Sequence, residues 1–257
     1  MEKEKPDIHR SGVVMQDRKT GNGLLVAVFS LLIQIFVAGC GLQDIPYYYP
    51  PVLTDSGVSA NTFTVTHDIR NYDSASLVQY FTGYEIYYRA YTNSSDASAA
   101  IAAMQSEIDR SDGSPSRAFE KLESLQFKRL YNADNSAAPI DDRPILRNFP
   151  LTAASFFTFY LKDSENWFYT ADGADPEAVG SRHFVSRYPS GTTTSQPFYL
   201  KSGYLAGDSD YTGSYSSPDT LYFVFYGVAY GQDSQSPLTV VPSFPNYSTS
   251  FFTFTPG

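Results

Sequence analysis

The chain has 257 residues, 18 of them basic and 27 acidic, which gives a formal net charge of −9. This acidic balance offers no cationic surface that could follow a phosphate backbone, so it argues against a nucleic-acid partner. The single cysteine excludes an internal disulfide, and the 21 Tyr and 19 Phe residues favour sheet over helix. We therefore expect a β-rich protein that is stabilised by its core.

The longest apolar run covers residues 24–39 and stops at the only cysteine, Cys40. As a helix this run would extend roughly 24 Å, which is less than the ~30 Å hydrocarbon core of a bilayer. Arg18 and Lys19 precede it, in the charged and then apolar order of a secretory signal peptide. Residues 37–40, VAGC, resemble the lipobox of bacterial lipoproteins, in which small residues precede the lipid-bearing cysteine. The alternative is an ordinary signal peptide or buried helix with a chance cysteine.

The lipobox resemblance implies that the chain is cut before Cys40 and that lipidation joins diacylglycerol to its thiol and a fatty acid such as palmitate to its new amine. Residues 1–39 would then be a signal peptide holding 5 basic and 4 acidic residues, so the mature charge is −10. Because two or three fatty chains form a durable anchor, we expect an extracytoplasmic protein of the cell envelope, anchored to the membrane rather than spanning it. Met15 offers a second start with a more ordinary leader. The whole chain also resembles Tyr-rich lipoproteins of spirochaetes.

Residues 40–57 contain three prolines and no apolar periodicity, which predicts an extended tether between the lipid and the domain. The three tyrosines at 47–49 either pack on the domain or lie at the bilayer interface, where amphipathic rings are favoured. We expect residues 58–257 to form a single β-rich domain.

Three stretches have the pattern of strands. Apolar residues and His67 alternate with polar ones over residues 62–69, which predicts a strand with one buried face. The stretch 81–91, FTGYEIYYRAY, predicts a second strand, and 220–233, TLYFVFYGVAYGQD, is apolar on both faces and is therefore expected at the centre of a sheet. The first of its two glycines, Gly227, predicts a bulge or the close approach of another segment.

The strands GYEIYYRAY and YFVFYGVAYGQDS, with the hairpin partner SPLTVVPSFP, resemble the C, F and G strands of a fibronectin type III domain. The resemblance implies two facing sheets, so the expected fold is an immunoglobulin-like or fibronectin-like β-sandwich. The long segment between the second and third strands implies a large insertion, and the tryptophan of the family is absent from its expected strand.

The insertion opens with two predicted helices over residues 94–126. In the first, Ala97, Ile101 and Met104 share one face, and Ser114 with Pro115 gives the start signal of the second. A narrow apolar stripe favours packing on the sandwich, with recognition of a partner as the alternative. Strand-like pieces then resume at QFKRLY, SFFTFYL, NWFYT, RHFVSRY and QPFYLKS.

No catalytic motif is found in the sequence. After Cys40 the chain has only two histidines and no cysteine, so an ordinary Cys and His zinc site cannot be assembled. His67 is expected in the core, and His183 is expected to be a solvated neighbour of Arg182 and Arg187. There is no Gly-x-Ser-x-Gly elbow, no His-Glu-x-x-His and no phosphate-binding glycine loop, and we therefore expect a protein that is not an enzyme.

One acidic loop has the spacing of a calcium site. Asp208, Asp210, Thr212 and Asp219 occupy loop positions 1, 3, 5 and 12, and position 6 is a glycine. The alternative is a solvated surface turn, in which Tyr211 would be exposed.

The leading functional hypothesis is a lipid-anchored binding or structural module of the envelope, with a protein or glycan ligand. Its basis is the combination of an anchor, a tether and a β-rich domain with surplus tyrosines, which supply contact area at low entropy cost. The alternative is an envelope hydrolase acting on glycan, which would need a cleft with two carboxylates about 5 to 10 Å apart.

Overall fold

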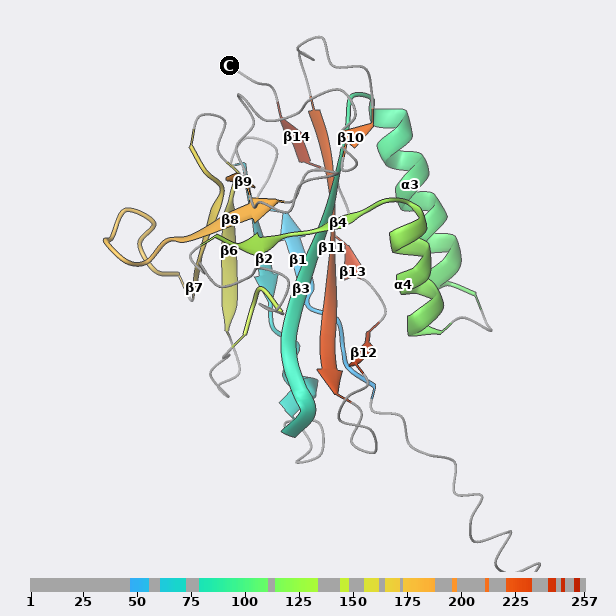
Figure 1. Cartoon of the computed structure of the whole chain (residues 1–257), viewed down its shortest axis with the longest axis horizontal. Coiled ribbons are helices and arrows are strands. Elements are labelled where there is room, and N and C mark those ends of the chain that lie inside the picture. Colours follow the sequence, from blue (N-terminus) through green and yellow to red (C-terminus); the bar gives the residue numbers. More distant parts are fainter. Residues whose placement is uncertain are drawn as a thin grey trace, which may run out of the picture. The chain divides into compact units, whose positions relative to one another are not determined.

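Two long antiparallel strands organise the fold: β3 (Phe81–Tyr91) and β11 (Leu221–Gln232). The computed structural model describes residues 47–55, 61–72, 79–110, 114–133, 144–147, 155–161, 165–171, 173–187, 196–197, 211–212, 221–232, 240–243, 246–247 and 252–254. Within it Tyr91 faces Tyr222 and Tyr84 faces Ala229, so the two strands run side by side over nearly their whole length (Figure 1). Aromatic and β-branched residues dominate both strands, which suits a pleated sheet.

The strands form two sheets, so the chain is mainly β as its composition indicates. Sheet 1 has the order β1 (Val52–Asp55), β2 (Thr62–Thr66), β6 (Phe156–Tyr160), β7 (Phe168–Ala171), β8 (His183–Arg187) and β5 (Tyr131–Asn132), with β9 (Gln196–Pro197) on β8. Sheet 2 has the order β10 (Tyr211–Thr212), β3, β11 and β12 (Val240–Pro242). β13 (Asn246–Tyr247) and β14 (Phe252–Phe254) also pair with β11, and β4 (Lys128–Arg129) pairs with β3. Among these neighbours only the pair of β10 and β3 is parallel.

The predicted helices are confirmed as α3 (Ser94–Ile108) and α4 (Pro115–Ser124), and a short 3₁₀ turn, η1 (Ile69–Tyr72), follows β2. The side chain of Asn93 accepts hydrogen bonds from the Ser95 and Asp96 N–H groups at the start of α3, and that of Ser114 accepts one from the Arg117 N–H at the start of α4. Both helices lie on the face of sheet 2 that is turned away from sheet 1 (Figure 1). The described elements therefore stack as helices, sheet 2 and sheet 1.

The two faces of β3 and β11 carry separate cores, as their alternating patterns predict. The core between the sheets contains the alternate residues Ile86, Tyr88, Phe223 and Phe225, packed against sheet 1. The core beneath the helices contains the other alternate residues of these strands, such as Tyr87, Val224 and Tyr226. Small or flexible helix side chains, such as Ala97 and Met104, pack on them. Trp167, which comes just before β7, is fully buried in the inner core and lies 5.1 Å from the Phe223 ring.

The segment expected to be a tether contributes to the domain. Val52–Asp55 pairs with β2, and Tyr48 is fully buried with its hydroxyl donating to the Gln232 carbonyl at 2.7 Å. A Cβ on Gly227 would lie 2.5 Å from Pro51 Cγ. This glycine therefore lets residues 47–55, the entering segment, approach β11 closely. The tether expected over residues 40–57 is thus corrected for residues 47–55, because β1 pairs with β2 and the side chains of Tyr48 and Leu53 join the core. Residues 40–46 and 56–57 lie outside the described ranges.

Candidate functional site

The outer face of β3 carries charged residues where the inner face carries apolar ones. Glu85 and Arg89 alternate there with Tyr87 and Tyr91, and all four are buried beneath or beside the helices. A buried charge is costly unless it is paired and hydrogen-bonded, so each of these charges must have a defined partner. The partners of these charges therefore determine the polar contacts of the outer face.

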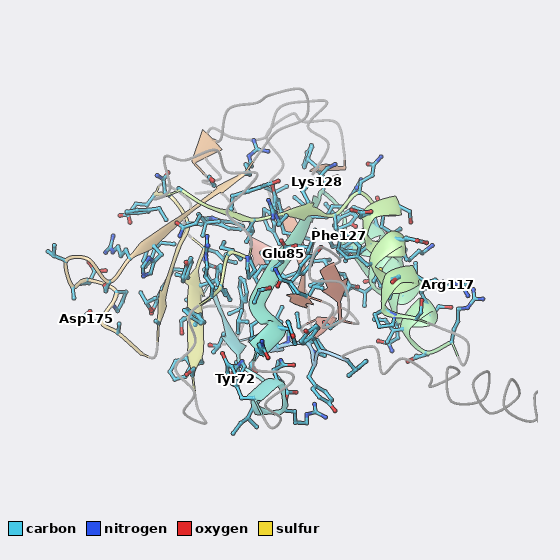
Figure 2. The ribbon with its side chains drawn as sticks, turned by 60° about the horizontal axis from the view of Figure 1, so that its bottom comes forward. Tyr72, Glu85, Arg117, Phe127, Lys128 and Asp175 are labelled. Atoms are coloured by element: carbon cyan, nitrogen blue, oxygen red, sulfur yellow. The ribbon has the colours of Figure 1, made fainter. Side chains whose placement is uncertain are left out.

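Glu85 is neutralised by an arginine from the neighbouring strand. Arg129 Nη1 lies 2.8 Å from Glu85 Oε1, and the Tyr87 hydroxyl donates to Glu85 Oε2 at 2.6 Å. The Arg129 guanidinium also lies 4.3 Å from the centre of the Tyr131 ring. Burial alone would lower the pKa of Arg129, but the charge and hydrogen bond of Glu85 raise it. Arg129 therefore stays cationic, and its contact with Glu85 joins β4 to β3 (Figure 2, which labels Glu85).

Arg89 bridges the same face to the end of α4. Its Nη1 donates to the Leu125 carbonyl at 2.6 Å and to Gln126 Oε1 at 3.1 Å, and its guanidinium lies 5.6 Å from the centre of the Tyr91 ring. Burial raises the pKa of Tyr91 to about 12, so this phenol stays protonated at neutral pH. The arginine thus satisfies a carbonyl at the helix C-terminus, where a cation is favoured.

An open groove of about 370 Å³ lies where β3, α3 and the end of α4 meet. Small side chains on α3, Ala99 and Ala100, leave this space beside the larger Tyr91. The exposed residues of its rim are polar or small, whereas the buried Tyr91 and Ala100 form an apolar floor beside the buried Arg89. The lining residues are Arg89, Tyr91, Asp96, Ala99, Ala100, Ser124, Leu125 and Gln126.

The groove combines hydrogen-bonding groups with an apolar floor. Asp96 can accept hydrogen bonds from a ligand, Gln126 can donate or accept them, and Ser124 adds a hydroxyl. Asp96 is the one carboxylate in this lining, whereas glycoside hydrolysis uses a pair. Convergent polar groups around an apolar floor are typical of a binding site.

A second polar cluster surrounds His67 at the opposite end of β3. The Tyr84 hydroxyl accepts from the Asp68 backbone N–H at 3.0 Å and from Asn71 Nδ2 at 2.9 Å, and lies 2.8 Å from His67 Nδ1. Because the hydroxyl has a single proton, it donates that proton to His67 Nδ1, which must then accept. Burial lowers the pKa of His67 to about 4, so the ring is neutral and belongs to the core, as the sequence predicts.

The structure describes only part of the predicted calcium loop. Asp208, Asp210 and Asp219 lie outside the described residues, while Thr212 belongs to β10, whose backbone pairs with Tyr91 of β3. Tyr211 is only 6% exposed and joins the inner core, which corrects the expectation of a solvated side chain. The reason is that β10 adds to the edge of sheet 2, so the alternate residue points inward.

The other predicted site residues are dispersed. Cys40 lies outside the described residues, and His183 stacks on Tyr169 at 5.0 Å with an interplanar angle of 22°. Arg187, expected near His183 in solvent, is 2% exposed. In the described ranges no three side chains of the His, Cys, Asp or Glu type gather as a metal site would require.

The groove does not follow from the sequence pattern alone, although one signal for it is present. Glu85 and Arg89 are charges on a strand whose neighbours are almost all apolar, and such a residue must meet a partner. What the pattern could not show is that the partner of Arg89 is the C-terminus of α4, 36 residues further along the chain.

Comparison with known proteins identifies no relative: no protein family, no curated protein and no solved structure matches this chain. Among the helices of the described ranges, none combines the length and apolar character needed to cross a bilayer.

Proposed function

We propose that this protein is a cell-envelope lipoprotein, anchored by lipid on Cys40, whose domain binds a protein ligand in the groove beside α3 and α4. The anchor is supported by the lipobox-like residues 37–40 and the apolar run before them. The binding role is supported by one observation, a groove whose apolar floor is bordered by Asp96, Ser124 and Gln126.

A protein ligand suits this groove better than a glycan. Sugars bind by stacking on an exposed aromatic face, but the Tyr91 ring is only 4% exposed and offers little of its face. An apolar floor with a polar rim is the anatomy of sites that accept an amino-acid side chain and its peptide groups. A segment of another protein is therefore the occupant that we propose.

We also propose that the two sheets are an immunoglobulin-like or fibronectin-like sandwich. The order β3, β11, β12 supports a match with the C, F and G strands, and the order β1, β2, β6 supports a match with A, B and E. The next strand, β7, departs from that plan because it follows β6 in the chain, whereas strand D precedes strand E.

Site-specific crosslinking tests the groove. A photoreactive amino acid is placed at Ser124, which lines the groove, or at Ser116, an exposed serine two turns earlier on α4. We expect a discrete crosslinked protein from position 124 and none from position 116 in intact cells. The same product from both positions, or none from either, would contradict binding in the groove.

The anchor has its own test. We expect Cys40→Ser to abolish incorporation of labelled palmitate and to release the protein from membranes or leave it as an uncleaved precursor, because the chain has no other thiol. Incorporation equal to that of the unaltered protein would refute lipidation at Cys40.

A further inference from the structure

The start of the domain forms a small exposed surface that the binding groove does not use. It consists of Tyr47, Tyr49, Ile69 and Arg70, which we call the aromatic end. Tyr47 is 42% exposed and Ile69 is 44% exposed, and these are two of the few large apolar side chains that lie open to solvent in the described ranges.

Hydrogen bonds hold the aromatic end in shape. Asn71, which is fully buried, accepts from the Tyr49 backbone N–H at 2.8 Å and donates to the Tyr49 carbonyl at 2.9 Å. Both bonds fasten the entering segment to η1. The Tyr47 and Tyr49 rings then meet edge to face at 5.1 Å.

The charge in this surface is balanced. Arg70 lies 3.9 Å above the Tyr49 ring and forms two hydrogen bonds with the Asp68 carboxylate, at 2.5 and 2.9 Å. The surface therefore presents phenol rings, one aliphatic side chain and a paired arginine. This composition is that of the membrane–water interface, where amphipathic rings and arginine stems are favoured.

Covalent geometry limits how far this surface can lie from the lipid. Tyr47 follows Cys40 by seven residues, and a fully extended chain of that length spans at most about 24 Å. A lipid on Cys40 thus keeps the aromatic end close to the headgroups whatever path the intervening residues take.

We propose that the aromatic end rests in the headgroup region of the bilayer and fixes the orientation of the domain. The inference depends on the proposed lipidation of Cys40. Because the Asp68–Arg70 pair is neutral overall and the chain is acidic, the contact is with the interface itself rather than with anionic lipids.

The orientation has a consequence for the groove. Tyr84, near the start of β3, contacts Asn71 beside the aromatic end, whereas Tyr91, at the other end of the same strand, lines the groove. Seven residues of strand separate them by roughly 23 Å. In Figure 1, α3 accordingly starts at the far end of β3 from η1. Contact through the aromatic end would hold the groove away from the bilayer, where a protein ligand can reach it.

Spin labelling of the full-length lipidated protein in vesicles tests the proposal. The only native cysteine is blocked by its lipid, so a label reports a single introduced thiol, Ile69→Cys or the control Val179→Cys. Val179 is fully exposed in the turn before β8, and Figure 2 places Asp175 of that turn on a different side of the molecule from Tyr72 of η1. Collision with oxygen, which enters lipid, and with a water-soluble nickel chelate is measured at both sites.

We expect the label at position 69 to collide several-fold less with the chelate and more with oxygen than the label at position 179. Equal values at both sites in an acylated, vesicle-bound protein would overturn the membrane contact and leave the lipid anchor standing. Lower collision with both reagents at position 69 would indicate a protein partner and also overturn it. If mass spectrometry shows no acyl group on Cys40, both proposals fall.

Discussion

The two faces of β3 and β11 differ although the same two strands supply both. The inner face meets a second sheet and is filled with rings: the Phe225 ring lies 4.6 Å from Phe63 and 6.1 Å from Trp167. The outer face meets two short helices and buries Glu85, Arg89 and Arg129 among tyrosines. A sheet covers a face evenly, whereas two helices with small side chains leave a groove at their ends. The inner face therefore carries the core that is filled with rings, and the outer face carries the groove and the buried charges.

The largest expected effect comes from a substitution on the inner face. Phe225→Ala removes a fully buried ring between the sheets and should lower the free energy of unfolding by about 3 to 5 kcal/mol. Urea denaturation of the purified protein measures the loss. A loss below about 1 kcal/mol would show that the inner face is not the main core.

A somewhat smaller effect tests the charges of the outer face. Arg129→Met removes the cation that neutralises buried Glu85 and should cost about 3 kcal/mol in unfolding free energy. Adding Glu85→Gln should recover much of that loss, since the neutral amide still accepts from Tyr87. A double variant no more stable than Arg129→Met would mean that the pair acts by packing rather than by charge.

The stability of the inner core should also depend on pH, because His67 at its edge is buried in the neutral form. Its pKa is about 4 in the folded protein and near 6.5 when unfolded, so the unfolded chain binds the proton first as pH falls. Stability contributed by neutral His67 should therefore fall by about 2 kcal/mol from pH 7 to pH 5. Urea midpoints at the two pH values should differ much less in the His67→Gln variant. An unchanged difference would assign the effect to other groups.

The smallest expected effect concerns the helical layer alone. Asn93→Ala removes the side chain that accepts from Ser95 N–H at 2.7 Å and Asp96 N–H at 3.1 Å at the start of α3. Loss of such a cap costs about 1 kcal/mol. Thermal unfolding followed by circular dichroism checks it, with exposed Ser98→Ala on the same helix as the control. Equal melting temperatures for the two variants would mean that the cap is not needed.

The strands and their faces could be predicted because alternation is a local property. The inner and outer sets of β3 and β11 follow directly from the order of residues such as Glu85 and Ile86. The pairing of Val52–Asp55 with the next strand was hidden by its length of four residues and by the prolines just before it. The burial of Tyr211 could not be predicted because it depends on β3, which is distant in the sequence. The groove has the same origin, since it forms where the end of α4 meets the start of α3.

The proposed binding in the groove is tested most directly by filling the groove. Ala99→Trp places a large ring in the groove from an exposed position, so unfolding free energy should change by less than about 0.5 kcal/mol. In this variant we measure two quantities: the yield of crosslinked protein from a photoreactive residue at position 124, and the midpoint of urea unfolding. We expect the crosslink to be lost while the midpoint is kept. A crosslink that persists in the filled groove would contradict it.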